Sequence, residues 1–151
     1  MARVLKKPGD VFRFPLAGSD AHGYAQWLND GTARVFLISS TSALTISEVC
    51  AAKVAFRVLV FKDTPGRYGW VKIGNAEVPS EYVQPQRYAK RDPISGATSL
   101  YFEGVETPAT LADLNGLETA AVWAHPHIVE RLEAQLAGRA SSFARSIAVA
   151  T

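Results

Sequence analysis

Side chains able to do chemistry are sparse in this sequence, and two histidines stand out among them. His125 and His127 flank Pro126, a spacing at which an extended segment can present two ligands to a zinc ion. A zinc site needs three or four protein ligands, and neither the cysteine nor the third histidine stands nearby. We therefore expect two polar residues at the start of a helix, with no metal and no cofactor bound.

Cys50 is the one cysteine of the chain, so it cannot form an internal disulfide. A nucleophile completed by a histidine from elsewhere in the fold is the chemical alternative. Its neighbours Val49, Ala51 and Ala52 carry no catalytic signature, and free cysteine is among the most buried residue types. We expect Cys50 to be a core residue.

Glu118 and Glu130 offer a second catalytic hypothesis, a pair of carboxylates for acid–base chemistry. Nothing in their spacing brings them together, so solvated or ion-paired roles are expected instead. Arg131 is a suitable partner for Glu118, and that ion pair would hold the last segment of the chain on a sheet. No catalytic residue is therefore assigned.

Two clusters combine cationic and aromatic side chains: Arg67 with Tyr68, and Arg87 with Tyr88 and Arg91. Arginine and aromatic residues dominate the binding energy of protein–protein interfaces. The same mixture can stack on single-stranded nucleic acid, but acidic neighbours dilute the second cluster. These five residues are the candidate anchors for a protein partner, exposed on loops that a rigid sheet holds in place.

Composition limits the class of protein further. The chain has 151 residues, of which 48% are hydrophobic and 20% are charged, and its net charge is +2. These values are typical of a globular domain and exclude a disordered tail, a collagen-like repeat and a disulfide scaffold. The charge is too small to favour nucleic acid or an anionic membrane as the partner. We expect one domain over residues 1–138 and a C-terminal tail over 139–151.

No segment is expected to target or cross a membrane. The start of the chain has basic residues but lacks the apolar run of a signal peptide. The most apolar stretch, Val54 to Phe61, contains Arg57 and is far shorter than the ~20 residues that a membrane helix needs. A cytoplasmic protein is expected.

The residue pattern predicts strands first and helices last. Strands are expected over 11–14, 23–28, 33–39, 54–61, 69–74 and 99–103. Asn29-Asp30-Gly31 predicts a tight hairpin turn, and Phe12 and Phe14 are expected to face the core. Pro85 makes residues 82–88 an edge strand or an extended loop.

Helices are expected at two main places. A short helix is expected within 42–52, where Ser42 could be its N-cap. The β-branched residues Thr45 and Ile46 disfavour a helix there. The clearest helix spans 126–136, with Ile128, Leu132 and Leu136 on one face. Residues 109–114 predict one helical turn, and 117–123 are ambiguous between strand and helix.

These elements predict an α+β fold. Its centre is a strongly twisted, mostly antiparallel sheet. One version of this prediction has the sheet curled into a partial barrel. A C-terminal helix packs against one face or end of that sheet. The order of strands followed by helices favours this arrangement over an alternating parallel sheet.

A set of short motifs follows in order along the chain, in residues 7–16, 23–26, 69–74, 116–123 and 127–132. From Lys6 to Gly138, this order of motifs resembles the immunity protein 26 family of bacterial polymorphic toxin systems. The resemblance implies a small cytoplasmic α+β protein that binds and neutralises a cognate toxin and has no catalytic residues. The family pairs with diverse toxins, so the resemblance names none.

Two other functions stay open at this level. A small RNA-directed enzyme or toxin of the barrel type also begins with a strand that follows Gly-Asp. Such an enzyme would need basic and acid–base groups that converge in a groove. An interaction module of a larger complex is the third possibility.

Overall fold

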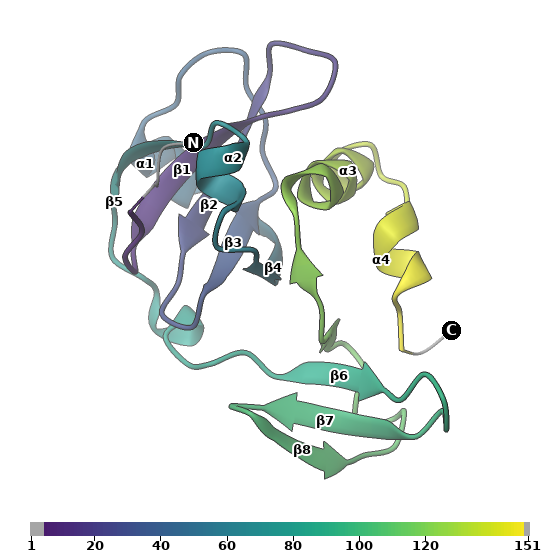
Figure 1. The fold of residues 1–151 in the computed structure, drawn as a ribbon. Coiled ribbons are helices and arrows are strands. Elements are labelled where there is room, and N and C mark those ends of the chain that lie inside the picture. Colours follow the sequence, from purple (N-terminus) through teal and green to yellow (C-terminus); the bar gives the residue numbers. More distant parts are fainter. Residues whose placement is uncertain (1–4, 150–151) are drawn as a thin grey trace.

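Two sheets and a C-terminal pair of helices make up the α+β fold seen in the computed structural model (Figure 1). The structure describes residues 5–149; residues 1–4 and 150–151, at the outer ends of the two ranges predicted above, lie outside the described residues. Among the described residues, no helix is both long and apolar enough to cross a lipid bilayer.

The larger sheet has the strand order β10-β4-β3-β2-β1-β5. All its neighbours pair antiparallel except β10 with β4. Its strands are β1 (Asp10–Pro15), β2 (His22–Trp27), β3 (Thr32–Phe36), β4 (Val54–Val60), β5 (Val71–Asn75) and β10 (Val122–Trp123). The sheet has two open edges, β5 and β10, so it does not close into the partial barrel that was one version of the prediction.

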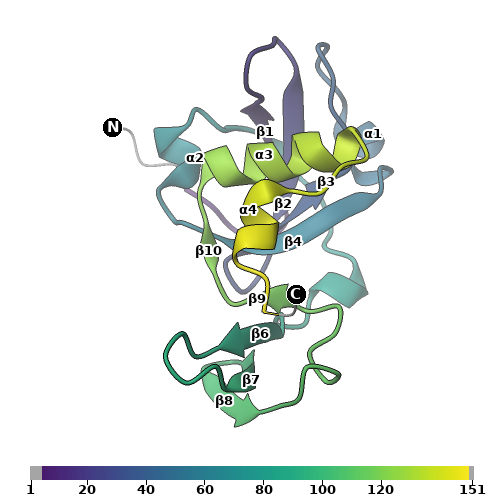
Figure 2. The same ribbon diagram turned by 90° about the vertical axis from the view of Figure 1, so that its right-hand side faces the viewer.

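The smaller sheet has the order β8-β7-β6-β9 and lies below the larger one in both views (Figures 1 and 2). Its strands are β6 (Tyr88–Arg91), β7 (Thr98–Phe102), β8 (Val105–Pro108) and β9 (Glu118–Thr119), with only β9 parallel to its neighbour. No strand was predicted at β8. The turn before it places Glu103 at φ 50° and Gly104 at φ 81°, a geometry that suits a two-residue hairpin.

The helices are α1 (Ile46–Cys50), α2 (Thr64–Arg67), α3 (His125–Leu136) and α4 (Ser142–Ser146), with a 3-10 turn, η1 (Ser80–Tyr82). The predicted short helix within 42–52 is present. Thr45 caps it, rather than Ser42, because the Thr45 side chain and Glu48 form a reciprocal capping box. Helix α4 lies in the segment expected to be a tail, and no sequence signal had predicted it.

The predicted hairpin is confirmed and its turn explains the register. Gly31 takes φ 80°, where a side chain would be strained. The carboxylate of Asp30 accepts a hydrogen bond from the backbone N–H of Thr32 at 3.2 Å. Beyond the turn, Trp27 pairs with Ala33 and Ala25 with Val35.

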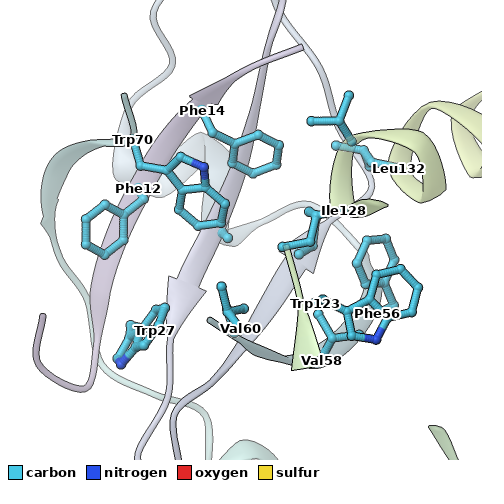
Figure 3. Close-up of a cluster of buried hydrophobic side chains, with 14 of the residues drawn as sticks. Phe12, Phe14, Trp27, Phe56, Val58, Val60, Trp70, Trp123, Ile128 and Leu132 are labelled. Atoms are coloured by element: carbon cyan, nitrogen blue, oxygen red, sulfur yellow. The ribbon is translucent and has the colours of Figure 1, made fainter. Parts of the chain in front are cut away.

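The main core lies between the larger sheet and α3 (Figure 3). Phe12 and Phe14 face it as predicted, and the Phe14 ring stacks on Trp70 with centroids 4.7 Å apart. Ile128 and Leu132 of α3 are fully buried against these rings. Leu136, at the C-terminal end of α3, is 41% exposed and does not share their burial. Four residues advance a helix by one full turn plus about 40°. The eight residues from Ile128 to Leu136 therefore displace the side chain by about 80° around the helix axis, toward solvent.

The opposite face of the larger sheet is also buried. Val11, Tyr24 and Phe36 pack there against Val49 of α1. The sequence pattern had assigned only the phenylalanine side of β1 to the core. Val11 is buried as well because α1 and its flanking loops cover the second face.

Candidate protein-binding surface

The loop between β6 and β7 is a short, well-ordered projection. Asp92 organises it: its Oδ1 atom accepts hydrogen bonds from the backbone N–H groups of Ile94 at 2.8 Å and Ser95 at 3.1 Å. The N–H of Gly96 donates to the carbonyl of Asp92 at 2.8 Å, with Gly96 at φ 76°. We call residues 92–97 the hairpin tip. These hydrogen bonds define the turn of its backbone.

Ile94 stands at this tip and is 96% exposed. Burying an isoleucine side chain is worth roughly 1.5–3 kcal/mol relative to leaving it in water. A rigid loop that presents such a residue to solvent forgoes this stabilisation in the isolated protein. A partner with an apolar pocket would recover it with little loss of conformational entropy.

Two hollows flank the tip, and Lys90, Asp92 and Pro93 line both. The first has a volume of about 550 Å³ and continues along the segment from Ser146 to Val149. The second has a volume of about 440 Å³ and continues toward Glu106. A partner could therefore contact the tip on both sides by filling the two hollows.

Cationic side chains lie along β6, from the residue before the strand to the tip. Arg91, at the end of β6, is exposed and donates a hydrogen bond to the carbonyl of Val149 at 3.3 Å. Lys90 is 2.8 Å from Glu106, and both side chains are about half exposed (47% and 48%). Arg87, just before β6, is exposed and its guanidinium lies 4.9 Å from the centre of the Phe102 ring. The structure thus brings Arg87 and Arg91 onto the smaller sheet.

Tyr88 was expected to be an exposed anchor beside these arginines, and that expectation is wrong. It is 8% exposed, because β6 begins at this residue and turns its ring inward against Tyr101. Burial, together with the charge of Asp30, raises the pKa of the Tyr88 hydroxyl to about 12. Tyr88 is part of the packing that supports the surface.

Arg67 and Tyr68 lie elsewhere, at the end of α2 beside the larger sheet. The Arg67 side chain is 61% exposed and sits 3.9 Å from Asp63. Tyr68 is half-buried and stacks on His125 with centroids 4.8 Å apart. These two residues border a hollow of about 240 Å³ that Phe61 and Ala124 also line. The cluster of Arg67 and Tyr68 is therefore a separate, smaller surface.

The two histidines begin α3, as expected, and they diverge. His125 accepts a hydrogen bond at Nδ1 from the indole N–H of Trp70 at 3.0 Å, and burial lowers its pKa. His127 stacks on Phe143 of α4 with centroids 3.7 Å apart. Within residues 5–149, no group of three or more His, Cys, Asp or Glu side chains is arranged to hold a metal ion.

The other residues considered for catalysis, Cys50, Glu118 and Glu130, are packed or hydrogen-bonded within the fold. Cys50 is partly buried at the edge of the cluster on the second sheet face. Glu118 is bound by Arg131, whereas Glu130 accepts hydrogen bonds from Ser141 and from the backbone of Ser142. Burial opposes ionisation of Glu130, but these hydrogen bonds hold its pKa below the usual value. The two carboxylates therefore serve separate structural purposes.

Sequence reasoning missed Ile94 as a functional candidate. The signal was present: an apolar residue stands inside the turn sequence Asp92-Pro93-Ile94-Ser95-Gly96. An apolar side chain has no role in forming such a turn.

Comparisons with protein-family models, with curated proteins and with solved structures found no match.

Proposed function

We propose that this protein binds and neutralises a cognate bacterial toxin in the cytoplasm by occupying its surface, without catalysis. The resemblance to the immunity protein 26 family suggests the class of partner. The hairpin tip is the observation that carries the proposal, because it presents Ile94 almost fully exposed on a pre-ordered loop.

The chemistry around the tip matches that of a protein–protein hot spot. A central apolar residue with arginines at its margin is a common arrangement, in which the apolar anchor fills a pocket and the arginines bind carboxylates. Arg91 and Arg87 are exposed on the same sheet. The toxin surface is therefore proposed to be acidic around an apolar pocket.

Two ion pairs that link strands and loops of the larger sheet are used inside the fold. Arg57 pairs with Asp30 at 3.1 Å, and Lys72 pairs with Asp10 at 2.9 Å. These contacts join strands and loops. Arg87 and Arg91 belong to none of the ion pairs among the described residues, which supports a binding role because carboxylates of a partner can pair with them.

The first test is co-expression. The reading frame beside this chain's gene is searched for a toxin domain, which is then induced in cells with this protein or with an empty vector, and survival is counted. We expect survival only with the protein. A neighbouring domain that kills equally in both cases contradicts the proposal, and RNA cleavage by the purified protein would favour the enzyme instead.

The second test is an alanine scan of the five predicted residues, with dissociation constants for the toxin domain. Arg87→Ala and Arg91→Ala are expected to weaken binding, each by about tenfold. Tyr88→Ala is expected to lower stability, because its side chain is buried. Larger losses at Arg67 and Tyr68 than at Arg87 and Arg91 would move the interface to the α2 surface.

A further inference from the structure

Arg34 is a buried guanidinium on the second face of the larger sheet. It lies on β3 and is 5% exposed. Its Cζ atom is 4.8 Å from the centre of the Phe36 ring and 5.1 Å from that of Tyr82. Its Nε atom donates a hydrogen bond to Gln26 Oε1 at 2.7 Å. Two aromatic walls and one amide therefore hold the guanidinium plane in place.

The terminal nitrogens of Arg34 have no partner among residues 5–149. No carboxylate of these residues is within 4.0 Å, and the Nε atom makes the only hydrogen bond of the side chain. Exposed Glu81 acts on Arg34 only from beyond that distance. The enclosed side-chain atoms that lack a partner belong to other residues, Arg13, Thr64 and Gln86, so the terminal nitrogens of Arg34 keep contact with solvent.

Arg57, the neighbour of Arg34 on the adjacent strand, has hydrogen-bond partners and a counter-ion for its guanidinium. It lies directly opposite Arg34 in the β3–β4 ladder, and 13% of its side chain is exposed. Its guanidinium donates to Asp30 at 3.1 Å, Thr32 at 2.9 Å and the carbonyl of Gln84 at 2.9 Å. The fold supplies a counter-ion to Arg57 and none to Arg34.

A buried charge without a counter-ion is costly, and proteins rarely retain one unless it is paired. A guanidinium offers two parallel N–H groups that match the two oxygens of a carboxylate or phosphate. We propose that Arg34 is an oxyanion-binding site, with Phe36 and Tyr82 as its walls and Gln26 as the residue that positions the fork. This site does not depend on the proposed toxin.

The direct measurement is the Nε–Hε resonance of Arg34 in a two-dimensional ¹H–¹⁵N NMR spectrum. The protein is titrated with potassium acetate and, separately, with potassium phosphate, each against potassium chloride of equal ionic strength. We expect the Arg34 signal to shift to saturation while the Arg57 signal, already paired, stays in place. Saturation by acetate identifies a carboxylate as the ligand, and saturation by phosphate alone identifies a phosphate group.

Variants provide the second readout, the melting temperature. An anion at ten times its dissociation constant should raise the melting temperature of the wild type by about 4 °C. Arg34→Met should remove this rise without lowering the melting temperature in chloride. Arg34→Lys should also remove the rise, because an ammonium lacks the fork. Arg57→Met is the matched control and should lower the melting temperature, because it leaves Asp30 unpaired.

Two results would overturn the proposal. The first is the absence of a saturable shift at Arg34 with either anion, or an equal shift at Arg57. The second is an Arg34→Met variant that loses as much thermal stability as Arg57→Met, which would make Arg34 a structural residue.

Discussion

Arg131 donates two parallel hydrogen bonds of 2.7 Å to the carboxylate of Glu118, and this ion pair links α3 to the smaller sheet. Arg131 belongs to α3, which covers the larger sheet, whereas Glu118 belongs to β9 of the smaller one. The same guanidinium lies 4.3 Å from the centre of the Phe56 ring and 5.1 Å from that of Trp123. The ion pair expected from the sequence is thus confirmed, and it packs on the edge of the main core.

The Arg131–Glu118 pair should contribute measurably to stability. Its side chains are 13% and 25% exposed, so water screens the pair less than a surface pair. A double-mutant cycle with Arg131→Met and Glu118→Gln should give a coupling free energy of about 2 kcal/mol in denaturant unfolding. The control is the Lys90–Glu106 pair at half exposure, where coupling should stay below about 1 kcal/mol. Equal coupling in the two cycles would contradict this role.

Two leucines of α3 that differ in burial should respond differently to truncation. Leu132 is fully buried in the main core, so Leu132→Ala should lower the free energy of unfolding by about 2–5 kcal/mol. Leu136 is 41% exposed, so Leu136→Ala should change it by less than about 0.5 kcal/mol. Urea unfolding followed by tryptophan fluorescence measures both. A large loss at Leu136 would mean that the last turn of α3 is covered.

Gly23 of β2 lies against Phe14 and against Leu132 of α3. A Cβ atom there would lie 2.6 Å from the Phe14 ring and 2.8 Å from Leu132 Cδ2. Gly23→Ala should therefore destabilise the protein by about 1–3 kcal/mol through overpacking. Combining it with Leu132→Ala should cost less than the sum of the two single changes, because the shorter side chain makes room. Strict additivity would place the strain elsewhere.

His125 should make stability depend on pH. Burial lowers its pKa in the folded state below the ordinary value of 6.5, so the unfolded chain binds a proton more readily. This contribution to the free energy of unfolding is fully present above pH 6.5 and is lost as the pH falls through 6.5 toward the lower folded pKa. Protonation would also remove the acceptor that Trp70 uses.

The variant His125→Gln isolates this effect, since glutamine cannot take up the proton. Denaturant unfolding at several pH values should show a smaller loss of stability for the variant than for the wild type as the pH falls below neutral. His127→Gln serves as the control, because His127 is exposed. An identical pH profile for His125→Gln and the wild type would contradict the assignment.

Local patterns predicted the parts of the fold that depend on neighbouring residues. The turn at Asn29-Asp30-Gly31, the core side of Phe12 and Phe14, and the helix from Pro126 to Leu136 were all visible in the sequence. The rest depends on contacts distant in the chain. Nothing near Glu118 reveals that two residues there add a parallel strand to β6.

The candidate site shows the same limit. Residue types correctly drew attention to Arg87 and Arg91, which are exposed on the smaller sheet. They misplaced Tyr88, since the inward face of a four-residue strand cannot be told from its outward face without a partner strand. The counter-ion that Arg57 has and Arg34 lacks follows only from how the loops fold over the sheet.

The most direct test of the proposed binding surface is the dissociation constant of an Ile94→Asp variant with the toxin domain, measured by isothermal titration calorimetry. Binding should weaken by at least about thirtyfold, because the change places a carboxylate in the apolar centre of the interface. The melting temperature should be unchanged, since Ile94 is 96% exposed. A folded Ile94→Asp variant that binds within about threefold of the wild type would contradict the account.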